Sequence, residues 1–106
     1  MTTITVFKES GLIIGYHASG HSEYAASGED IVCAAASIIT QSTLLGLQEV
    51  AKVKITASKD DDKALLEVKL HEQNDQAQTI LKTMELALKN LQEQYPKYVQ
   101  VKEEAK

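Results

Sequence analysis

The sequence predicts an α+β domain with two helices on a mainly antiparallel sheet, in a two-layer or sandwiched arrangement. Three observations lead to this prediction. Short segments alternate apolar and polar residues with the period of two that is typical of strands, and two longer segments carry apolar residues at helical spacing. The predicted order is strand-strand-helix-strand-strand-helix-strand, without an internal repeat. Because 106 residues fill only one core, residues 1–106 are expected to form a single domain.

The chain begins with a predicted hairpin. Residues 3–8 alternate apolar residues with threonines, and residues 12–18 place a set of apolar side chains on one face at period two: Leu12, Ile14, Tyr16 and Ala18. The turn between them falls at residues 9–11. Residues 19–29 are small and polar, contain two glycines and have no period, so they are predicted to be a loop.

Residues 30–50 form the first predicted helix, because they are apolar on most sides and contain no proline. Such a helix is buried on more than one face, so we expect a second element or a partner subunit to cover what the sheet does not. Its start has two capping candidates, Asp30 itself and Ser27 with Asp30 three residues later. Both starts place Cys33 within the first two turns.

The second predicted hairpin joins residues 52–58 and 64–70, which both alternate. Three aspartates and a lysine separate them and predict a solvated turn at residues 60–63. His71 shares strand parity with Glu67 and Lys69, so we expect it to face solvent.

An amphipathic helix and a last strand complete the predicted fold. Asn74 or Asp75 caps the helix, and Pro96 ends it. Its apolar stripe is expected to lie on the sheet: Ala77, Ile80, Leu81, Met84, Leu88, Leu91 and Tyr95. Residues 99–102 alternate as the final short strand.

Charge and hydropathy exclude several classes of protein. The chain has 15 acidic and 11 basic residues, a net charge of −4 and no block of Lys or Arg, which argues against nucleic-acid binding and fits a cationic partner. No continuous apolar run approaches the roughly eighteen residues of a membrane span. The N-terminal residues lack the pattern of a secretory signal, so we expect the protein to act in the cytoplasm.

Cys33 is the only cysteine, so it is a small buried residue, a lone metal ligand or a reactive thiol. The unpaired N–H groups at a helix start favour a thiolate over a thiol and can receive a developing oxyanion. His21, twelve residues earlier in the glycine-bearing loop, is a candidate base or ion-pair partner. In the alternative interpretation, Cys33 simply packs beside three alanines and His21 binds a backbone carbonyl.

Five further residues near this pair are candidates for the site. Gly20 and Gly28 remove side chains where a substrate backbone would approach. Tyr24 either lines a substrate groove or packs the loop on the domain. Asp30 either orients the histidine or serves as an ordinary N-cap. Ser37, one turn after the cysteine, either donates to the site or bonds back to the helix backbone.

The metal-ligating residue types do not form a recognisable metal motif. They comprise His17, His21, Cys33 and His71, apart from the carboxylates. Because they include neither a Cys-x-x-Cys pair nor a His-Glu-x-x-His run, we expect no metal and no cofactor.

One segment resembles a known family. Residues 20–37, GHSEYAASGEDIVCAAAS, closely resemble the signature of the ribosomal-processing cysteine protease family, Prp, of Firmicutes and related bacteria. That signature is Gly-His, a spacer with Tyr, then Gly-x-Asp-Ile-Val-Cys-Ala-Ala-x-Ser. The spacing matches throughout, and the element order extends the likeness over almost the whole chain. The departures, Ser22 for a frequent Ala and Ala36 for a frequent Val, bear on substrate fit because neither falls on the cysteine or the histidine.

The resemblance implies a cysteine endopeptidase with Cys33 as nucleophile and His21 as its base. It implies that the substrate is the precursor of large-subunit ribosomal protein number twenty-seven, whose N-terminal extension is removed after a phenylalanine during ribosome maturation. It also implies a homodimer, and a loop between histidine and cysteine that orders when peptide binds.

Two alternatives remain at this stage. The first is a non-catalytic module that binds a ribosomal protein or an assembly intermediate, with Cys33 packed in its helix. The second, a thiol redox sensor, is weaker because the chain contains no resolving cysteine.

Overall fold

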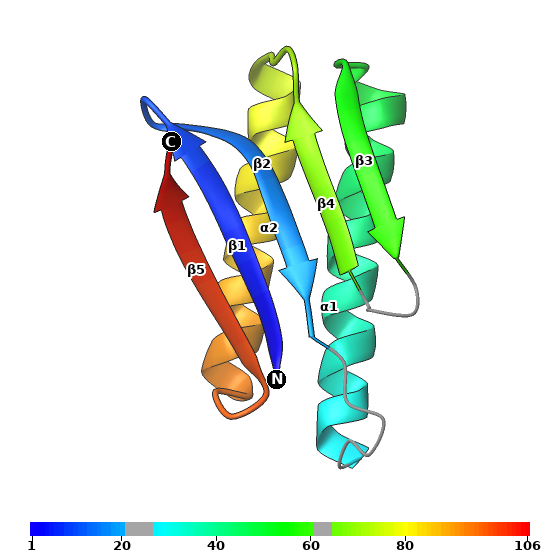
Figure 1. The fold of residues 1–106 in the computed structure, drawn as a ribbon, viewed down its shortest axis with the longest axis vertical. Coiled ribbons are helices and arrows are strands. Elements are labelled where there is room, and N and C mark those ends of the chain that lie inside the picture. Colours follow the sequence, from blue (N-terminus) through cyan, green and yellow to red (C-terminus); the bar gives the residue numbers. More distant parts are fainter. Residues whose placement is uncertain (21–26, 61–64) are drawn as a thin grey trace.

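The computed structural model describes residues 1–20, 27–60 and 65–106, which form five strands, two α-helices and a short π-helix (Figure 1). In chain order these are β1 (Thr2–Glu9), β2 (Leu12–Ser19), α1 (Ser27–Gly46), η1 (Leu47–Ala51), β3 (Ile55–Asp60), β4 (Leu65–Leu70), α2 (Asp75–Gln94) and β5 (Val99–Ala105). The predicted order of strands and helices is confirmed, with η1 added at the end of α1.

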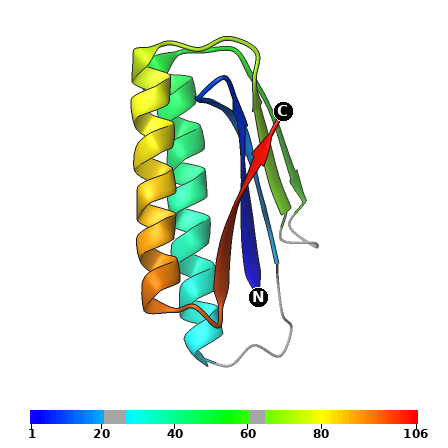
Figure 2. The same cartoon turned by 90° about the vertical axis from the view of Figure 1, so that its left-hand side faces the viewer.

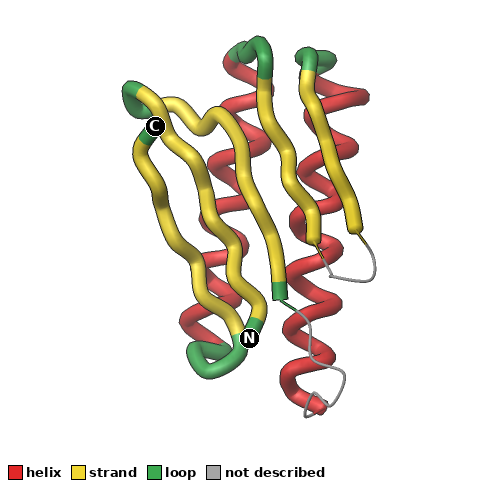
Figure 3. Tube along the Cα trace, viewed as in Figure 1, coloured by secondary structure: helices red, strands yellow, loops and turns green. Residues whose placement is uncertain are grey.

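The five strands form one sheet in the order β3-β4-β2-β1-β5 (Figure 3). Neighbouring strands are antiparallel except for β1 and β5, which are parallel. Both helices lie side by side against the same face of the sheet (Figure 2). The α+β prediction is therefore confirmed in its two-layer form, with a mainly antiparallel sheet.

The first hairpin turns where the sequence predicts, but its second strand departs from simple alternation. Ser10 and Gly11 have φ angles of 52° and 82°, as a two-residue hairpin loop with positive φ at both positions requires. Phe7 pairs with Gly15 whereas Lys8 pairs with Ile13, so Ile14 is the extra residue of a β-bulge.

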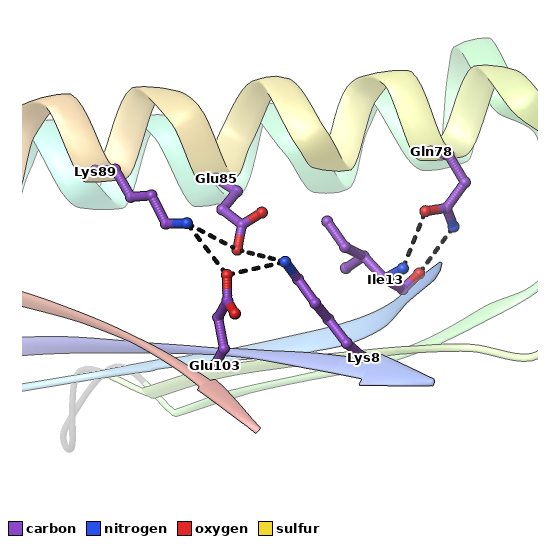
Figure 4. Close-up of polar contacts among 6 residues, drawn as sticks. All are labelled: Lys8, Ile13, Gln78, Glu85, Lys89 and Glu103. Carbon is purple, nitrogen blue, oxygen red and sulfur yellow. Dashed lines mark hydrogen bonds and ion pairs between the residues drawn. The ribbon is translucent and has the colours of Figure 1, made fainter. Parts of the chain in front are cut away.

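The prediction that Ile14 lies on the inner face of β2 is wrong because of this bulge. Because the extra residue reverses the in-out alternation, Ile13 and Tyr16 are both fully buried, whereas Ile14 is only half-buried. Gln78 of α2 bonds to the backbone beside the bulge: its Nε2 donates to the Ile13 carbonyl at 2.9 Å, and its Oε1 accepts from the Ile13 N–H at 3.0 Å (Figure 4).

The core lies between the sheet and the two helices. The largest fully buried apolar side chains come from both layers: Ile4, Val6, Ile13, Tyr16, Val32, Leu47, Val68, Leu81, Met84, Leu88 and Val99. Each such side chain contributes about 1.5–3 kcal/mol by leaving water. The hydroxyl of Tyr16 donates to the Thr40 carbonyl at 2.7 Å, and burial raises the pKa of this tyrosine.

Helix α1 begins earlier than one of the two predicted caps allows. It starts at Ser27, so Asp30 is the fourth helical residue and the prediction of Asp30 as N-cap is wrong. Cys33 is the seventh helical residue, which confirms its place in the first two turns. Gly46 lies where α1 crosses α2, since a Cβ there would be 3.3 Å from two carbons of Ile80.

The predicted strand at residues 52–58 is shifted, because the helix runs on through η1 to Ala51. Lys52 then takes a left-handed conformation, and the Val53 N–H donates to the Leu47 carbonyl at 3.3 Å. Val53 is consequently buried as part of the helix end, and β3 begins only at Ile55.

Helix α2 follows the prediction closely. The Asn74 side chain accepts from the Ala77 N–H at 2.8 Å, which confirms Asn74 as the N-cap. The stripe packs on the sheet, with Ala77, Leu81, Met84 and Leu88 buried. The helix ends at Gln94, two residues before Pro96.

One face of α1 remains uncovered. Ile31, Ile38 and Leu45, each seven residues apart, have exposed fractions of 63%, 68% and 59%. Within the 22-residue helical stretch Asp30–Ala51, an 18-residue window has a mean hydropathy of 1.5, so length and composition alone would suit a membrane span. In this fold, the opposite face of the stretch packs against the sheet through residues such as Val32 and Leu47.

Candidate active site

Cys33 lines a cavity of about 180 Å³ beside the end of β2. The cavity is formed by residues of four strands, by Gly20 after β2 and by the middle of α1: Thr2, Ala18, Ser19, Gly20, Cys33, Ala36, Ser37, Thr40, Gln41, Lys59, Asp60, Leu65 and Leu66. Residues from three distant parts of the chain therefore surround the only thiol, which is itself half-buried.

Gly20 brings the chain to the thiol. Its carbonyl oxygen lies 3.9 Å from Cys33 Sγ, a distance that allows the weak S–H donor to point at it. Gly20 has a φ of +121°, and a Cβ there would stand 2.1 Å from the Met1 carbonyl oxygen. Glycine is thus required at position 20 for two local reasons. Its φ angle disfavours a residue with a side chain, and the Met1 carbonyl occupies the space that a Cβ would need.

The described residues bring together only some of the predicted site. Cys33, Ser37 and Gly20 all line the cavity. Asp30 is exposed and does not line it. Two further candidates, His21 and Tyr24, lie outside the described residues, and Gly28 belongs to the first turn of α1.

Neither of the two described histidines lines the cavity. His17 is the sixth of the eight residues of β2, where it pairs with Thr5 and Glu67 on the neighbouring strands. His71 directly follows β4, faces solvent as predicted, and its ring bonds to the hydroxyl of Thr56. The end of β4 and the start of α1 are at opposite ends of the domain (Figure 1).

The described residues do not gather a metal site. Across residues 1–20, 27–60 and 65–106, no group of three or more His, Cys, Asp or Glu side chains is placed to hold a metal ion. The described lining of the cavity offers a thiol together with hydroxyl, amide and backbone groups and the charged side chains of Lys59 and Asp60.

Sequence reasoning missed the cavity residues contributed by Gln41 and by the second hairpin. Gln41 Nε2 donates to Ser37 Oγ at 2.8 Å, so these two polar side chains of α1 are joined. The spacing of four residues from Cys33 to Ser37 and from Ser37 to Gln41 is the signal that would have found Gln41. Lys59 and Leu65 reach the cavity only through sheet pairing, which leaves no local signature.

Cys33 lies less than one turn beyond the free N–H groups at the start of α1. The free N–H groups of an α-helix belong to its first four residues, here residues 27–30, whereas Cys33 is the seventh. Helical side chains lean toward the N-terminus, so Sγ projects over the turn that precedes Cys33.

Comparison with known proteins agrees with this chemistry. The model of a family described as cysteine protease Prp matches residues 1–100. Two proteins named ribosomal processing cysteine protease Prp, from Staphylococcus aureus strains Mu50 and NCTC 8325, are each 29% identical over 93 residues, which is 87% of this chain and 87% of each relative.

Solved structures share the fold. The S. aureus ribosomal processing protease Prp in complex with a substrate peptide superposes with a TM-score of 0.92 at 24% identity, covering 98% of this chain and 100% of that one. The protein SMU.848 from Streptococcus mutans gives a TM-score of 0.90 at 22% identity, covering 100% and 99%. Because the family match spans nearly the whole chain and the only cysteine lines the cavity, this protein belongs to the cysteine protease Prp family.

Proposed function

We propose that this protein is an endopeptidase in ribosome maturation, with Cys33 as nucleophile and His21 as base. The observation that carries the proposal is the place of Cys33 in the cavity. A cysteine protease needs a cysteine nucleophile, and the chain contains one cysteine only. The cavity beside this single thiol would receive a side chain of a bound peptide.

The base is proposed by elimination among three histidines. His17 and His71 do not line the cavity. His21 follows Gly20 directly in the chain, and the Gly20 carbonyl lies 3.9 Å from Cys33 Sγ. The chain therefore leads into residue 21 from beside the thiol, which supports His21 in this role.

The reaction we propose is acyl transfer through a thioester. His21 accepts the Cys33 proton, and the thiolate attacks the scissile carbonyl carbon to give a tetrahedral intermediate. The C–N bond breaks as His21 donates the proton to the leaving amine. Water then attacks the thioester, His21 again accepts a proton, and the C–S bond breaks to release the carboxylate and restore the thiol.

The substrate we propose is the precursor of large-subunit ribosomal protein number twenty-seven, cut after a phenylalanine. A cavity of about 150 Å³ is known to accept benzene, and the cavity beside Cys33 measures about 180 Å³. Part of its lining is apolar, from Ala18, Ala36, Leu65 and Leu66. The net charge of −4 also favours encounter with a cationic ribosomal protein.

We further propose that the protein works in the cytoplasm as a homodimer. The exposed side chains Ile31, Ile38 and Leu45 form one apolar stripe along α1. An apolar stripe of this length loses contact with water when a second copy covers it. Ribosomal proteins are made in the cytoplasm, which supports that compartment.

The test is cleavage of the purified precursor, weighed by mass spectrometry. Cys33→Ala and His21→Ala are each expected to slow cleavage by about a thousandfold or more. The matched controls His17→Ala and His71→Ala are expected to retain the wild-type rate. Full cleavage by Cys33→Ala contradicts the proposed nucleophile.

The same experiment separates the protease from a non-catalytic binding module. A module would bind the precursor and leave its mass unchanged, even with wild-type protein. Its half-buried Cys33 would react with iodoacetamide only at the pH at which a free thiol ionises, whereas a catalytic thiolate reacts in the folded protein below that pH.

A further inference from the structure

We propose that Gln41 is a positioning residue that acts on the Cys33 thiolate through the hydroxyl of Ser37. The inference rests on the proposed function of Cys33 as nucleophile. Its structural basis is the hydrogen bond of 2.8 Å from Gln41 Nε2 to Ser37 Oγ, inside the cavity that contains the thiol.

The three side chains form one row along α1. Cys33, Ser37 and Gln41 are spaced by four residues and all line the cavity. Side chains with this spacing are neighbours on a helix surface, with Cβ atoms about 5–6 Å apart. Because each side chain leans toward the N-terminus, Gln41 reaches Ser37, and Ser37 leans toward the turn that bears Cys33.

The bond from Gln41 determines where the Ser37 hydroxyl points. The threonine hydroxyls of the two helices bond back to a carbonyl four residues earlier, as Thr40 does to Ala36 at 2.9 Å and Thr79 to Asp75 at 3.0 Å. Ser37 Oγ instead accepts from Gln41. A hydroxyl has one hydrogen, and no described residue accepts that of Ser37. In the proposal this hydrogen turns toward the sulfur when the Cys33 thiolate forms.

The backbone that presents this row is held firmly. Thr40 Oγ1 donates to the carbonyls of Ala36 and Ser37, at 2.9 Å and 3.2 Å. The buried Tyr16 hydroxyl donates to the Thr40 carbonyl. The three side chains therefore keep their orientation toward the cavity. The backbone of α1 is fixed, and the hydrogen bond from Gln41 sets the orientation of the Ser37 hydroxyl.

The charged side chains that face this cavity come from β3. They are Lys59 and Asp60, which both line it, and α1 and β4 contribute neutral residues within the described ranges. A hydrogen bond to the charged form of a group favours that form. Donation from Ser37 thus increases the share of thiolate, in addition to any effect of Lys59 and Asp60, which the variants below leave unchanged.

The first test compares three substitutions at one position. Gln41→Met fills similar space without a donor, and we expect kcat for the precursor to fall about threefold to tenfold with little change in KM. Gln41→Lys keeps a donor and is expected to recover most of the loss. Gln41→Glu offers only acceptors to the Ser37 hydrogen, so its kcat is expected to be at least as low as that of Gln41→Met. Wild-type activity in Gln41→Glu with loss in Gln41→Lys overturns the proposed direction of the bond.

The second test uses alkylation of Cys33 in the folded protein, which needs no substrate. The pH profile of the iodoacetamide rate is expected to move to higher pH in Gln41→Met, whereas the exposed control Gln48→Met keeps the wild-type profile. A loss of kcat with an unchanged profile would mean that Gln41 is merely structural, and overturns the inference.

The third test is a double-mutant cycle. If Gln41 acts through Ser37, adding Gln41→Met to Ser37→Ala has no further effect on kcat or on the alkylation profile. Additive effects of the two substitutions overturn the inference. Its failure is distinct from failure of the proposed function: in the first case Cys33→Ala is inactive and Gln41→Met equals wild type, and in the second Cys33→Ala still cleaves.

Discussion

Lys8 of β1 and Glu85 of α2 form an ion pair between the two layers of the domain, with Nζ and Oε2 3.1 Å apart (Figure 4). Glu103 of β5 lies 2.9 Å from the same Nζ, and Lys89 lies 3.1 Å from Glu103. The four side chains join α2 to the parallel pair of strands. Glu85 is only 8% exposed, so its partners matter more than those of a surface carboxylate.

Removal of Lys8 is therefore expected to destabilise the fold. Lys8→Met leaves the buried Glu85 carboxylate with one ion-pair partner among the described residues, Lys89 at 3.7 Å, and should lower the free energy of unfolding by about 1–3 kcal/mol. Urea unfolding measures this. The matched control Lys69→Met removes an exposed pair with Glu67 and should cost less than about 0.5 kcal/mol. Equal effects of the two substitutions would contradict the importance of burial.

The same cluster predicts a pH dependence of stability. The hydrogen bonds that the ammonium groups of Lys8 and Lys89 donate lower the pKa of Glu103 to about 2, from an ordinary value of 4.5. A lowered pKa stabilises the fold above pH 4.5, and the contribution is lost as pH falls toward 2. Unfolding midpoints measured across this range should fall more steeply in wild type than in Glu103→Gln. Parallel curves would be inconsistent with the proposed link.

The amide of Gln78 is expected to be essential for the bulged strand. Gln78→Leu leaves the buried N–H and carbonyl of Ile13 without partners, so the free energy of unfolding should fall by about 2–4 kcal/mol. Gln76→Leu, at an exposed position of the same helix, is the control and should change it by less than about 0.5 kcal/mol. Thermal unfolding distinguishes them, because 1 kcal/mol corresponds to about 4–8 °C in a domain of this size.

Gly20 is expected to tolerate no side chain. Gly20→Ala combines an unfavourable φ with a clash against the Met1 carbonyl, and should cost at least about 2 kcal/mol and reduce cleavage by displacing the chain beside Cys33. Gly11→Ala isolates the conformational part, since its φ is also positive but no atom lies within 4 Å of the added Cβ. It should cost about 1 kcal/mol and leave cleavage intact. Equal stability of the two variants would argue against the clash.

The exposed stripe of α1 predicts the outcome of a charge substitution. Ile38→Glu should convert the proposed homodimer into a folded monomer, because Ile38 is 68% exposed in the single chain and its replacement disturbs no core contact. Analytical ultracentrifugation measures the change. Leu86→Glu on α2, where the side chain is 69% exposed, is the control and should leave the dimer intact. An Ile38→Glu protein that sediments as wild type would contradict the proposed interface.

The sequence alone determined the class of fold and left one candidate for the nucleophile. Periods of two and 3.6 are local properties, so the two hairpins and the stripe of α2 follow from them directly. The N-cap Asn74 is also local, because its side chain bonds within the first turn. A chain with one cysteine, in a segment that resembles a cysteine protease signature, similarly leaves one nucleophile to choose.

Only the tertiary structure decided which distant residues surround Cys33 and which faces are covered. Ile13 is buried in place of Ile14 because of a bulge, and the strand after α1 begins late because the helix continues as η1. Lys59 and Leu65 reach the cavity because β3 and β4 join the sheet beside β2, next to the start of α1. Strand pairing and layer packing depend on contacts between segments far apart in the chain. The alternation of residues within one segment does not identify the strand that pairs with it or the helix that covers it.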